Sequence, residues 1–359
     1  MRTAQPGIRT APVAGGQTMR AVVQDRYGAS PEDVLRLADI APPALAADQV
    51  LVRVRAASVD RGTWHVMAGL PWPIRLAGFG LRRPAYTNPG RNLAGTVEAI
   101  GADVTGLAPG DEVYGIGDST FAEYAAASSD KVAMKPARLP FGPAAAVPVS
   151  GLTALQAVRD HGRVQPGHRV LVLGASGGVG SFAVQIAKAL GAEVTGSAGT
   201  AKVAMVEALG VDHVLDHDRA DFVDSGHRYD VVLDTGGNAR LSRLRRALTP
   251  HGRLVIVGGE TDGRLLGGSG RQIRASLLSP FTGQQLSTFI ASENSADLDT
   301  LSALIDAGSV VPVVDRTYPL ADTAAAIRQL LDRRVRGKVV VSVPPAITRT
   351  HTPGSGSTT

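Results

Sequence analysis

The sequence predicts an α/β protein with a mostly β first part and a second part built around a parallel, doubly wound sheet. From Met19 to about Ala127, the apolar residues come in short runs separated by Gly, Pro and Asp turns, which is typical of a small antiparallel barrel. From about Val149, short apolar strands alternate with stretches whose apolar residues recur every three or four positions. Such wholly apolar strands fit a parallel sheet that is covered by helices on both faces.

The composition excludes several classes of protein. The chain has 359 residues, of which 44% are hydrophobic and 19% charged, as in folded globular proteins of one or two domains. It contains no cysteine, which excludes disulfides, thiolate nucleophiles and cysteine-ligated zinc. The net charge of +5 includes no run of like charges, so we expect no nucleic-acid partner. We find no membrane span and no signal peptide, and expect a cytoplasmic protein.

Each element of the first part is expected where an apolar run lies between turn residues. We expect strands at residues 20–23, 50–54, 95–100, 112–116 and 121–126. Residues 1–18 and 346–359 are rich in Ala, Thr, Gly, Pro and Ser without periodicity, and we expect both to be disordered tails.

The second part follows an alternation of strand and helix. We expect strands at 169–174, 193–196, 213–215, 229–234 and 253–257, with helices at 179–190, 201–209 and 238–248. Residues 286–291 are a candidate edge strand, and 321–331 a helix. The last strand, 338–343, is expected to return to the first part.

The strongest motif is the glycine-rich turn between the first strand and first helix of the second part. It consists of Gly174, Ala175, Ser176, Gly177, Gly178, Val179 and Gly180. Gly177 lets the backbone approach a pyrophosphate, Gly180 lets helix and strand pack closely, and free N–H groups at the helix start favour an anion. Ser176 also fits the Gly-x-Ser-x-Gly pattern of hydrolases. The second strand and Gly180 favour dinucleotide binding instead.

The end of the second strand indicates which dinucleotide binds. NAD enzymes of this design place an acidic residue there, but here Ser197 and, shortly after it, Lys202 follow, and Glu193 lies at the opposite end. A hydroxyl and a nearby cation suit a 2′-phosphate. The sequence therefore favours NADP(H) over NAD(H), although Lys202 could alternatively be an ordinary solvated lysine.

Taken together, the segments from Met19 to about Val343 resemble the medium-chain dehydrogenase/reductase superfamily, and most of all its zinc-independent quinone oxidoreductase branch. The resemblance rests on 19–28, 89–97, 109–113, 151–154, 174–180, 210–216 and 336–339. It implies a GroES-like β-barrel catalytic domain (19–148), a Rossmann NADP(H)-binding domain (149–308) and a C-terminal segment (309–345) returning to the catalytic domain. It also implies a homodimer formed through the edge of the Rossmann sheet.

The departures from the family concern zinc. The resemblance places the three catalytic zinc ligands of the alcohol dehydrogenases at Asp60, Arg91 and Val149, and a glutamate position at Asn92. We therefore expect no metal. His213 and His217 stand four residues apart but in a strand running into a loop, so we interpret them as solvated residues rather than ligands.

The resemblance also implies roles for single residues. It puts Thr153 beside the nicotinamide, Asp60 near nicotinamide and substrate, and Lys338 at the pyrophosphate. His65 is the first choice as proton donor, because an imidazole titrates near neutrality. Each of these residues also has a structural alternative. Thr153 would cap a helix and Asp60 would be a turn residue. His65 would be a structural histidine and Lys338 a solvated turn lysine.

Further candidates rest on position alone. Tyr114 and Tyr124 are alternative proton donors or acceptor-stacking rings, unless they pack in the core. Gly236, Asn238 and Gly258 follow strands at the edge of the sheet where ligands bind, or they serve only the turns. Residues 64–86 are expected to line or cover an apolar acceptor site, and are long enough for a lid.

The sequence thus predicts a small-molecule reductase that transfers hydride from NADPH to a quinone or an α,β-unsaturated carbonyl. Enoyl-thioester reduction and alcohol or aldehyde oxidoreduction are alternatives within the superfamily. A non-catalytic NADPH-binding sensor is the alternative of another class.

Overall fold

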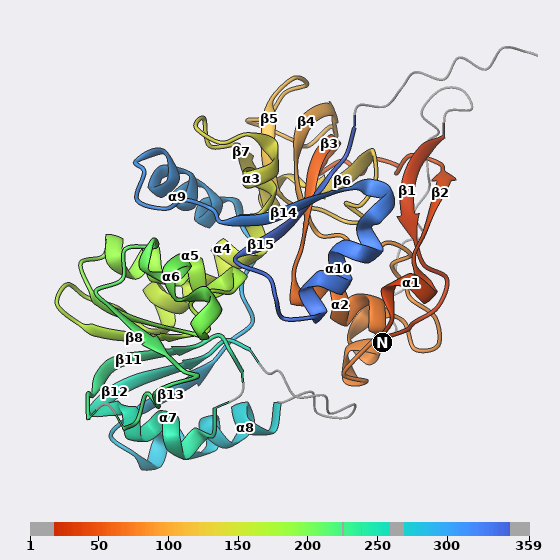
Figure 1. Cartoon of the computed structure of the whole chain (residues 1–359). Helices are drawn as coiled ribbons and strands as arrows, with labels where there is room; N and C mark the ends of the chain where they lie inside the picture. Colours follow the sequence, from red (N-terminus) through yellow and green to blue (C-terminus); the bar gives the residue numbers. More distant parts are fainter. Residues whose placement is uncertain (1–17, 225, 238, 259–268, 345–359) are drawn as a thin grey trace, which may run out of the picture.

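The computed structural model describes residues 18–224, 226–237, 239–258 and 269–344 (Figure 1). Asn238, one of the predicted cofactor residues, therefore lies outside the described residues, as do the predicted tails apart from Thr18.

The first part contains a two-stranded and a seven-stranded sheet. Its elements up to the second part are β1 (Met19–Val23), α1 (Pro31–Val34), β2 (Arg36–Ile40), β3 (Gln49–Val59), α2 (Arg61–Ala68), the π-helix η1 (Arg75–Phe79), β4 (Asn92–Ile100), β5 (Glu112–Ile116), β6 (Tyr124–Ser128), η2 (Ser129–Lys131), β7 (Val132–Met134) and α3 (Phe141–Ala145). Two strands from the end of the chain, β14 (Val314–Pro319) and β15 (Lys338–Ser342), complete the seven-stranded sheet. Its order is β14-β15-β3-β4-β5-β7, with β6 also paired to β3. The long strand β3 thus joins β4 on one side to β6 and β15 on the other.

One strand of the first part begins later than the sequence predicts. The apolar run suggests a strand from residue 121, but β6 begins at Tyr124. The buried Asn88 side chain donates to the carbonyl oxygens of Ser119 and Phe121, at 3.1 and 3.0 Å. These bonds hold residues 119–121 as an irregular turn, although Phe121 itself is fully buried.

The second part is a six-stranded parallel sheet with the order β10-β9-β8-β11-β12-β13, as predicted for a doubly wound fold. Its elements are α4 (Pro148–Gln156), η3 (Ala157–His161), β8 (Arg169–Leu173), α5 (Gly178–Ala189), β9 (Glu193–Ala198), η4 (Thr200–Lys202), α6 (Val203–Glu207), β10 (His213–Asp216), β11 (Tyr229–Asp234), α7 (Leu241–Ala247), β12 (Leu248–Ile256), α8 (Ser269–Leu278), η5 (Ser279–Phe281) and β13 (Gln285–Thr288). The predicted edge strand, β13, does lie at the edge.

Alternate side chains of each strand in this sheet pack against opposite helix layers. Val170 and Val172 of β8 belong to the core shared with α5, whereas Leu171 and Leu173 belong to the core shared with α7. Figure 1 shows α5 and α6 on one face of the sheet and α7 and α8 on the other. This two-sided burial explains why the strands are apolar throughout.

The C-terminal segment returns to the first part. It consists of α9 (Ser295–Asp306), β14 (Val314–Pro319), η6 (Leu320–Asp322), α10 (Thr323–Leu331) and β15 (Lys338–Ser342). β15 pairs antiparallel with β3, placing Val340 opposite Ser58, and parallel with β14. β14, for which the sequence predicted no strand, adds one parallel pair to a sheet whose other pairs are antiparallel.

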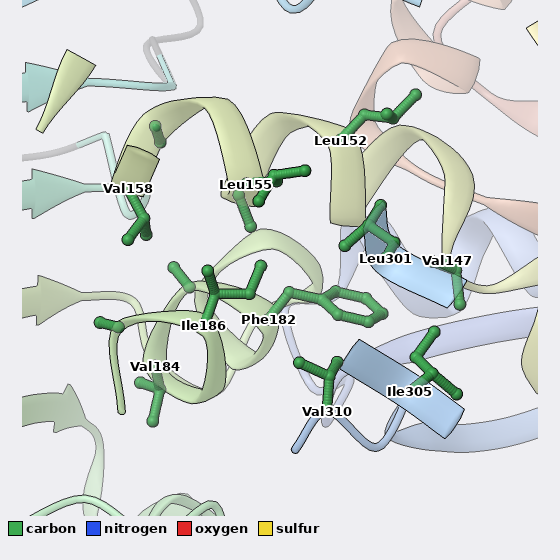
Figure 2. Packing of buried hydrophobic residues seen from close by; sticks show 14 of the residues in the cluster. Val147, Leu152, Leu155, Val158, Phe182, Val184, Ile186, Leu301, Ile305 and Val310 are labelled. Atoms are coloured by element: carbon green, nitrogen blue, oxygen red, sulfur yellow. The ribbon is translucent and has the colours of Figure 1, made fainter. Parts of the chain in front are cut away.

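The two parts share a hydrophobic core around α4, α5 and α9. Figure 2 shows the fully buried Phe182 of α5 lying among residues of α4 and α9, and near Val310. This core fixes the start of α5, and with it the glycine-rich turn.

Candidate functional site

A cleft of about 690 Å³ lies along the carboxyl ends of the parallel strands. Its lining comes from three places: the start of α2 in the first part, the glycine-rich turn with the loops after β11 and β12, and the segment leading into β15. These are the regions in which the sequence placed most of its candidate residues.

The glycine-rich turn has the geometry of a dinucleotide cradle. Gly174 has φ +79°, and a Cβ on Gly180 would lie 2.1 Å from the carbonyl oxygen of Gly174. The α5 N-cap, Gly177, supplies no side chain to the first-turn N–H groups, so the helix start can take an anion. Ala175 N–H donates to the carbonyl oxygen of Ser197 at 3.0 Å, tying the turn to β9. Gly174, Ser176, Gly177, Gly178 and Val179 line the cleft.

Lys338 brings a buried cation to the start of α5. Its side chain is only 2% exposed, and Nζ donates to Ser150 Oγ at 3.1 Å. Gly337 N–H donates to the carbonyl oxygen of Ser176 at 2.9 Å, which holds this residue beside the turn. Burial lowers the Lys338 pKa, while the charge of Asp60 opposes that shift. The alternative of a solvated turn lysine is therefore wrong.

The far end of the cleft holds Ser197 and Lys202. Ser197 is buried, with Oγ 3.3 Å from His217 Nδ1. Lys202 Nζ donates to the carbonyl oxygens of Arg333 and Val335, at 2.9 and 2.8 Å, and its burial lowers its pKa. Lys202 therefore lines the cleft and is bonded to the C-terminal segment. It is not the ordinary solvated lysine of the alternative interpretation.

Sequence reasoning missed three residues at this end. His217 and Asp218 follow β10, and Arg333 precedes β15; all three line the cleft. The position of the first two directly after a parallel strand was a usable signal. Arg333 carried no such signal, because it reaches the cleft only where the C-terminal segment, between α10 and β15, packs against the second part.

Asp60 is fixed by two hydrogen bonds at the start of α2. Its Oδ1 accepts from the Thr63 N–H at 3.0 Å in a capping box, and Oδ2 accepts from Asn92 Nδ2 at 2.7 Å. Asn92 Oδ1 in turn accepts from the Val149 N–H at 2.9 Å. The structure thus joins Asp60, Asn92 and Val149 through hydrogen bonds.

Arg91 makes a separate connection. Its Nη2 donates to both carboxylate oxygens of Glu293, at 2.8 and 2.7 Å, and Lys131 Nζ lies 3.0 Å from the same carboxylate. Over the residues the structure describes, no group of three or more His, Cys, Asp or Glu side chains is placed to hold a metal ion.

His65 and Thr153 both line the cleft. His65 Nδ1 lies 2.7 Å from the carbonyl oxygen of Leu70 and must donate to it, so Nδ1 carries a proton in the neutral ring. Thr153 Oγ1 donates to the carbonyl oxygen of Val149 at 2.7 Å, inside α4. The alternative that Thr153 caps a helix is therefore wrong, because α4 begins at Pro148.

Tyr114 does not reach the cleft. It is fully buried, and its hydroxyl donates to the carbonyl oxygen of Leu298 at 2.6 Å, with Ser302 Oγ at 3.0 Å. Burial raises the pKa of this phenol far above its usual value. The structure contradicts Tyr114 as a proton donor and gives it the packing role instead. Tyr124 lies under the Arg53 guanidinium, away from the cleft lining.

A buried ion pair supports the loops after β11 and β12. Asp234 contacts Arg271 at 2.6 Å and accepts from the Gly237 N–H at 3.0 Å, and burial raises its pKa. Arg271 also donates to the carbonyl oxygen of Gly258 at 2.9 Å. Gly236 and Gly258 line the cleft beside Thr235, another residue the sequence reasoning missed.

Comparison with known families agrees with this architecture. A family profile described as "Alcohol dehydrogenase GroES-like domain" matches residues 46–137, and one described as "Zinc-binding dehydrogenase" matches 209–341. In the described part of the chain, no helix has the length and apolar character needed to cross a membrane.

Similar proteins cover nearly the whole chain. The quinone oxidoreductase of Sus scrofa is 30% identical over 343 residues, covering 92% of this chain and 99% of that protein. The 2-methylene-furan-3-one reductase of Solanum lycopersicum is 30% identical, covering 91% and 80%. The structure of the quinone oxidoreductase from Coxiella burnetii aligns with a TM-score of 0.77 at 28% identity, covering 91% of this chain and 100% of that one.

Proposed function

Because the chain belongs to the medium-chain dehydrogenase/reductase superfamily, in its quinone oxidoreductase-like branch, we propose that it is an NADPH-dependent, zinc-independent reductase of quinones or α,β-unsaturated carbonyls. Oxidoreductase activity with a nicotinamide cofactor follows from the family itself. The observation that carries the proposal is the cleft in which the glycine-rich turn, His65 and Lys338 meet.

The residues present fit a dinucleotide. Side chains at Gly174 or Gly180 would collide with neighbouring atoms, while Gly177 and Gly178 line the cleft without side chains. Lys338 places a positive charge near the uncapped start of α5. Thr153, Gly236 and Gly258 would flank the nicotinamide half. When bound, the cofactor supplies the hydride that the reduction needs.

The preference for NADPH rests on charge at the far end of the cleft. Lys202 and Arg333 line it, and Arg336 is bonded to the Ala201 carbonyl oxygen nearby. These cations suit a 2′-phosphate. Asp218 is the one acidic group of the described lining at this end, and Thr200 N–H already donates to it at 2.9 Å.

Zinc independence rests on the donor set. Of the three positions that hold zinc in related dehydrogenases, Arg91 and Val149 carry side chains that cannot ligate a metal. Asp60 is engaged with Thr63 and Asn92. Without a Lewis acid, reduction of an electron-poor double bond or quinone requires less assistance than oxidation of an alcohol.

His65 is the proposed proton donor. The bond from Nδ1 to Leu70 fixes the orientation of the ring, so that Nε2 can deliver a proton to the reduced acceptor. Asp60, the N-cap of the same helix, also lines the cleft and would lie near the nicotinamide and the acceptor, as the family resemblance implies.

We also propose the domain limits given by the resemblance, and a homodimer. β13 leaves one edge of the parallel sheet unpaired within the described residues. Next to it, Leu277 and Phe281 are 66% and 86% exposed. Large exposed apolar side chains beside an open edge favour a partner of the same kind.

The test is a turnover assay with purified protein and NADPH on a panel of quinones, enones, enoyl thioesters and aldehydes. We expect oxidation of NADPH by a quinone or enone, and His65→Phe should lower kcat about 10²-fold or more without changing NADPH affinity. Preference for enoyl thioesters would favour the alternative within the superfamily. Tight NADPH binding without turnover on the whole panel would favour the sensor.

A further inference from the structure

An exposed apolar and cationic segment follows α2. Residues 70–87 include η1 and carry Trp72, Leu76 and Leu81, whose exposed fractions are 54%, 77% and 64%. Arg82 and Arg83 are exposed in the same segment. Large apolar side chains this exposed and this close together usually mark an interaction surface.

The charge around this segment is strongly one-sided. Residues 70–87 contain three arginines and no aspartate or glutamate, and of these Arg82 and Arg83 are exposed. Arg91, farther along the chain, is already paired with Glu293 and adds no uncompensated charge to this surface. The partner of this surface is therefore expected to be anionic.

The segment is held in place rather than loose. Tyr27 Oη contacts the carbonyl oxygens of Phe79 and Gly80, the latter at 2.7 Å. Arg75 Nε donates to the Gly69 carbonyl oxygen at 2.9 Å while its guanidinium stacks on the Tyr27 ring. These contacts occupy the interior side of the segment and leave the apolar side chains outward.

We propose that residues 70–87 dock on an anionic lipid surface, with Trp72, Leu76 and Leu81 entering the interface and Arg82 and Arg83 contacting headgroups. Tryptophan and leucine beside arginine is the composition that binds at the boundary between headgroups and acyl chains. A second copy of this chain would oppose arginines with arginines, and a purely ionic partner would leave the three apolar side chains in water. The proposal does not depend on the reaction the enzyme catalyses.

The docked surface adjoins the cleft. The segment begins at Leu70, whose carbonyl oxygen accepts from His65, and His65 lines the cleft. Docking would therefore hold the acceptor end of the cleft close to the membrane surface, where lipophilic acceptors dissolve.

The test is cosedimentation of the full-length protein with extruded vesicles, either pure phosphatidylcholine or a mixture with phosphatidylserine. We expect binding to the mixed vesicles and little binding to the neutral ones. Arg82→Gln/Arg83→Gln should lower the partition coefficient about 30-fold, at roughly 1 kcal/mol for each cation near the surface. Leu76→Ser/Leu81→Ser should lower it at least about 10-fold.

Matched controls distinguish this surface from general charge. Arg240→Gln/Arg246→Gln removes two exposed arginines at α7, and Leu37→Ser removes an exposed leucine on β2. Both should bind vesicles as the wild type does. In a Trp64→Phe background, Trp72 is the remaining tryptophan, and its emission should shift to the blue on mixed vesicles.

Three results would overturn the proposal. One is the absence of binding to mixed vesicles; another is wild-type binding by Arg82→Gln/Arg83→Gln. The third is equal binding to soluble polyglutamate at the same charge concentration, which would identify an acidic macromolecule as the partner.

Discussion

Lys338 and Asp60 reach the cleft from two paired strands. Val339 of β15 lies opposite Val59 of β3, so the register sets Lys338 at the start of one strand beside Asp60 at the end of the other. The glycine-rich turn then covers Lys338, and a Cβ on Gly178 would lie 2.9 Å from its Cδ. Because an unpaired buried lysine is costly, we propose that the purpose of this charge is to hold a phosphate of the bound cofactor.

Replacing Lys338 with methionine tests that purpose. The Kd for NADPH should rise about 10- to 100-fold, because a charged hydrogen bond to phosphate is lost. The folded-state pKa of Lys338 lies below 10.5, so only between that pKa and 10.5 does the unfolded chain hold a proton that the folded chain has released, and in that window stability rises with pH. Lys338→Met should remove this rise. Unchanged NADPH titrations would contradict the assigned role.

Asp60 gives a prediction on stability. Asp60→Ala removes the cap of α2 and should lower the free energy of unfolding by about 1 kcal/mol in urea denaturation. Asp60→Asn keeps a capping oxygen but sets an NH2 group against Asn92 Nδ2, so it keeps the cap and loses the bond from Asn92. Wild-type stability of Asp60→Ala would contradict the capping role.

At the scale of elements, the glycine-rich turn shows why some positions accept no side chain. A Cβ at Gly180 would overlap the Gly174 carbonyl oxygen, whereas one at Gly142 of α3 would meet only Val340 Cγ1 at 3.8 Å. Gly180→Ala should therefore lower the free energy of unfolding by about 2 kcal/mol or more and abolish NADPH binding. Gly142→Ala should leave both nearly unchanged. Thermal denaturation and nucleotide titration of the pair measure this directly, and wild-type binding by Gly180→Ala would refute it.

The N-terminus of α9 gives a prediction on pH. Burial raises the Asp297 pKa, but hydrogen bonds from Arg159, Gln156 and Asn294 outweigh it and hold the pKa below 3.8. This stabilisation is present above that pH and is lost as the pH falls through the folded-state pKa. Asp297→Asn should therefore cost about 2 kcal/mol at neutral pH and almost nothing in strong acid. If urea denaturation shows that Asp297→Asn lowers the free energy of unfolding equally at all pH values, the ionised carboxylate of Asp297 is not what stabilises the fold.

The sequence predicts elements well where local pattern and packing agree. The strands Glu112–Ile116 and Tyr229–Asp234 begin and end as predicted. Strand β6 does not begin at residue 121 as predicted. The side chain of Asn88, some thirty residues earlier in the chain, holds residues 119–121 in a turn. Tyr114 shows the same limit at the site: its burial against α9 depends on a contact 184 residues distant, which no local pattern reveals.

At the scale of the whole molecule, contacts between distant parts of the chain limit what the sequence predicts. The glycine-rich turn was predictable because its residues are consecutive. Lys202 was predictable as a position, but its anchoring to Arg333 and Val335 depends on the return of the chain. The clamp from Arg91 and Lys131 to Glu293 likewise joins residues about 160 to 200 positions apart.

That clamp should hold the two parts of the molecule together. Glu293→Gln leaves two half-buried cations without their carboxylate and should lower the free energy of unfolding by about 1–3 kcal/mol. Glu98→Gln breaks the more exposed pair with Arg53 and should cost less than about 1 kcal/mol. Equal losses in urea denaturation would show that Glu293 has no special part in joining the two regions.

The most direct test of the central claim is a parallel fluorescence titration of the wild-type protein with NADPH and NADH, followed in the same sample by a quinone or enone. We predict saturable binding of both, tighter for NADPH, and oxidation of the bound nucleotide when the acceptor is added. Absence of binding by either nucleotide would contradict the interpretation of the glycine-rich turn, and with it the function proposed for the cleft.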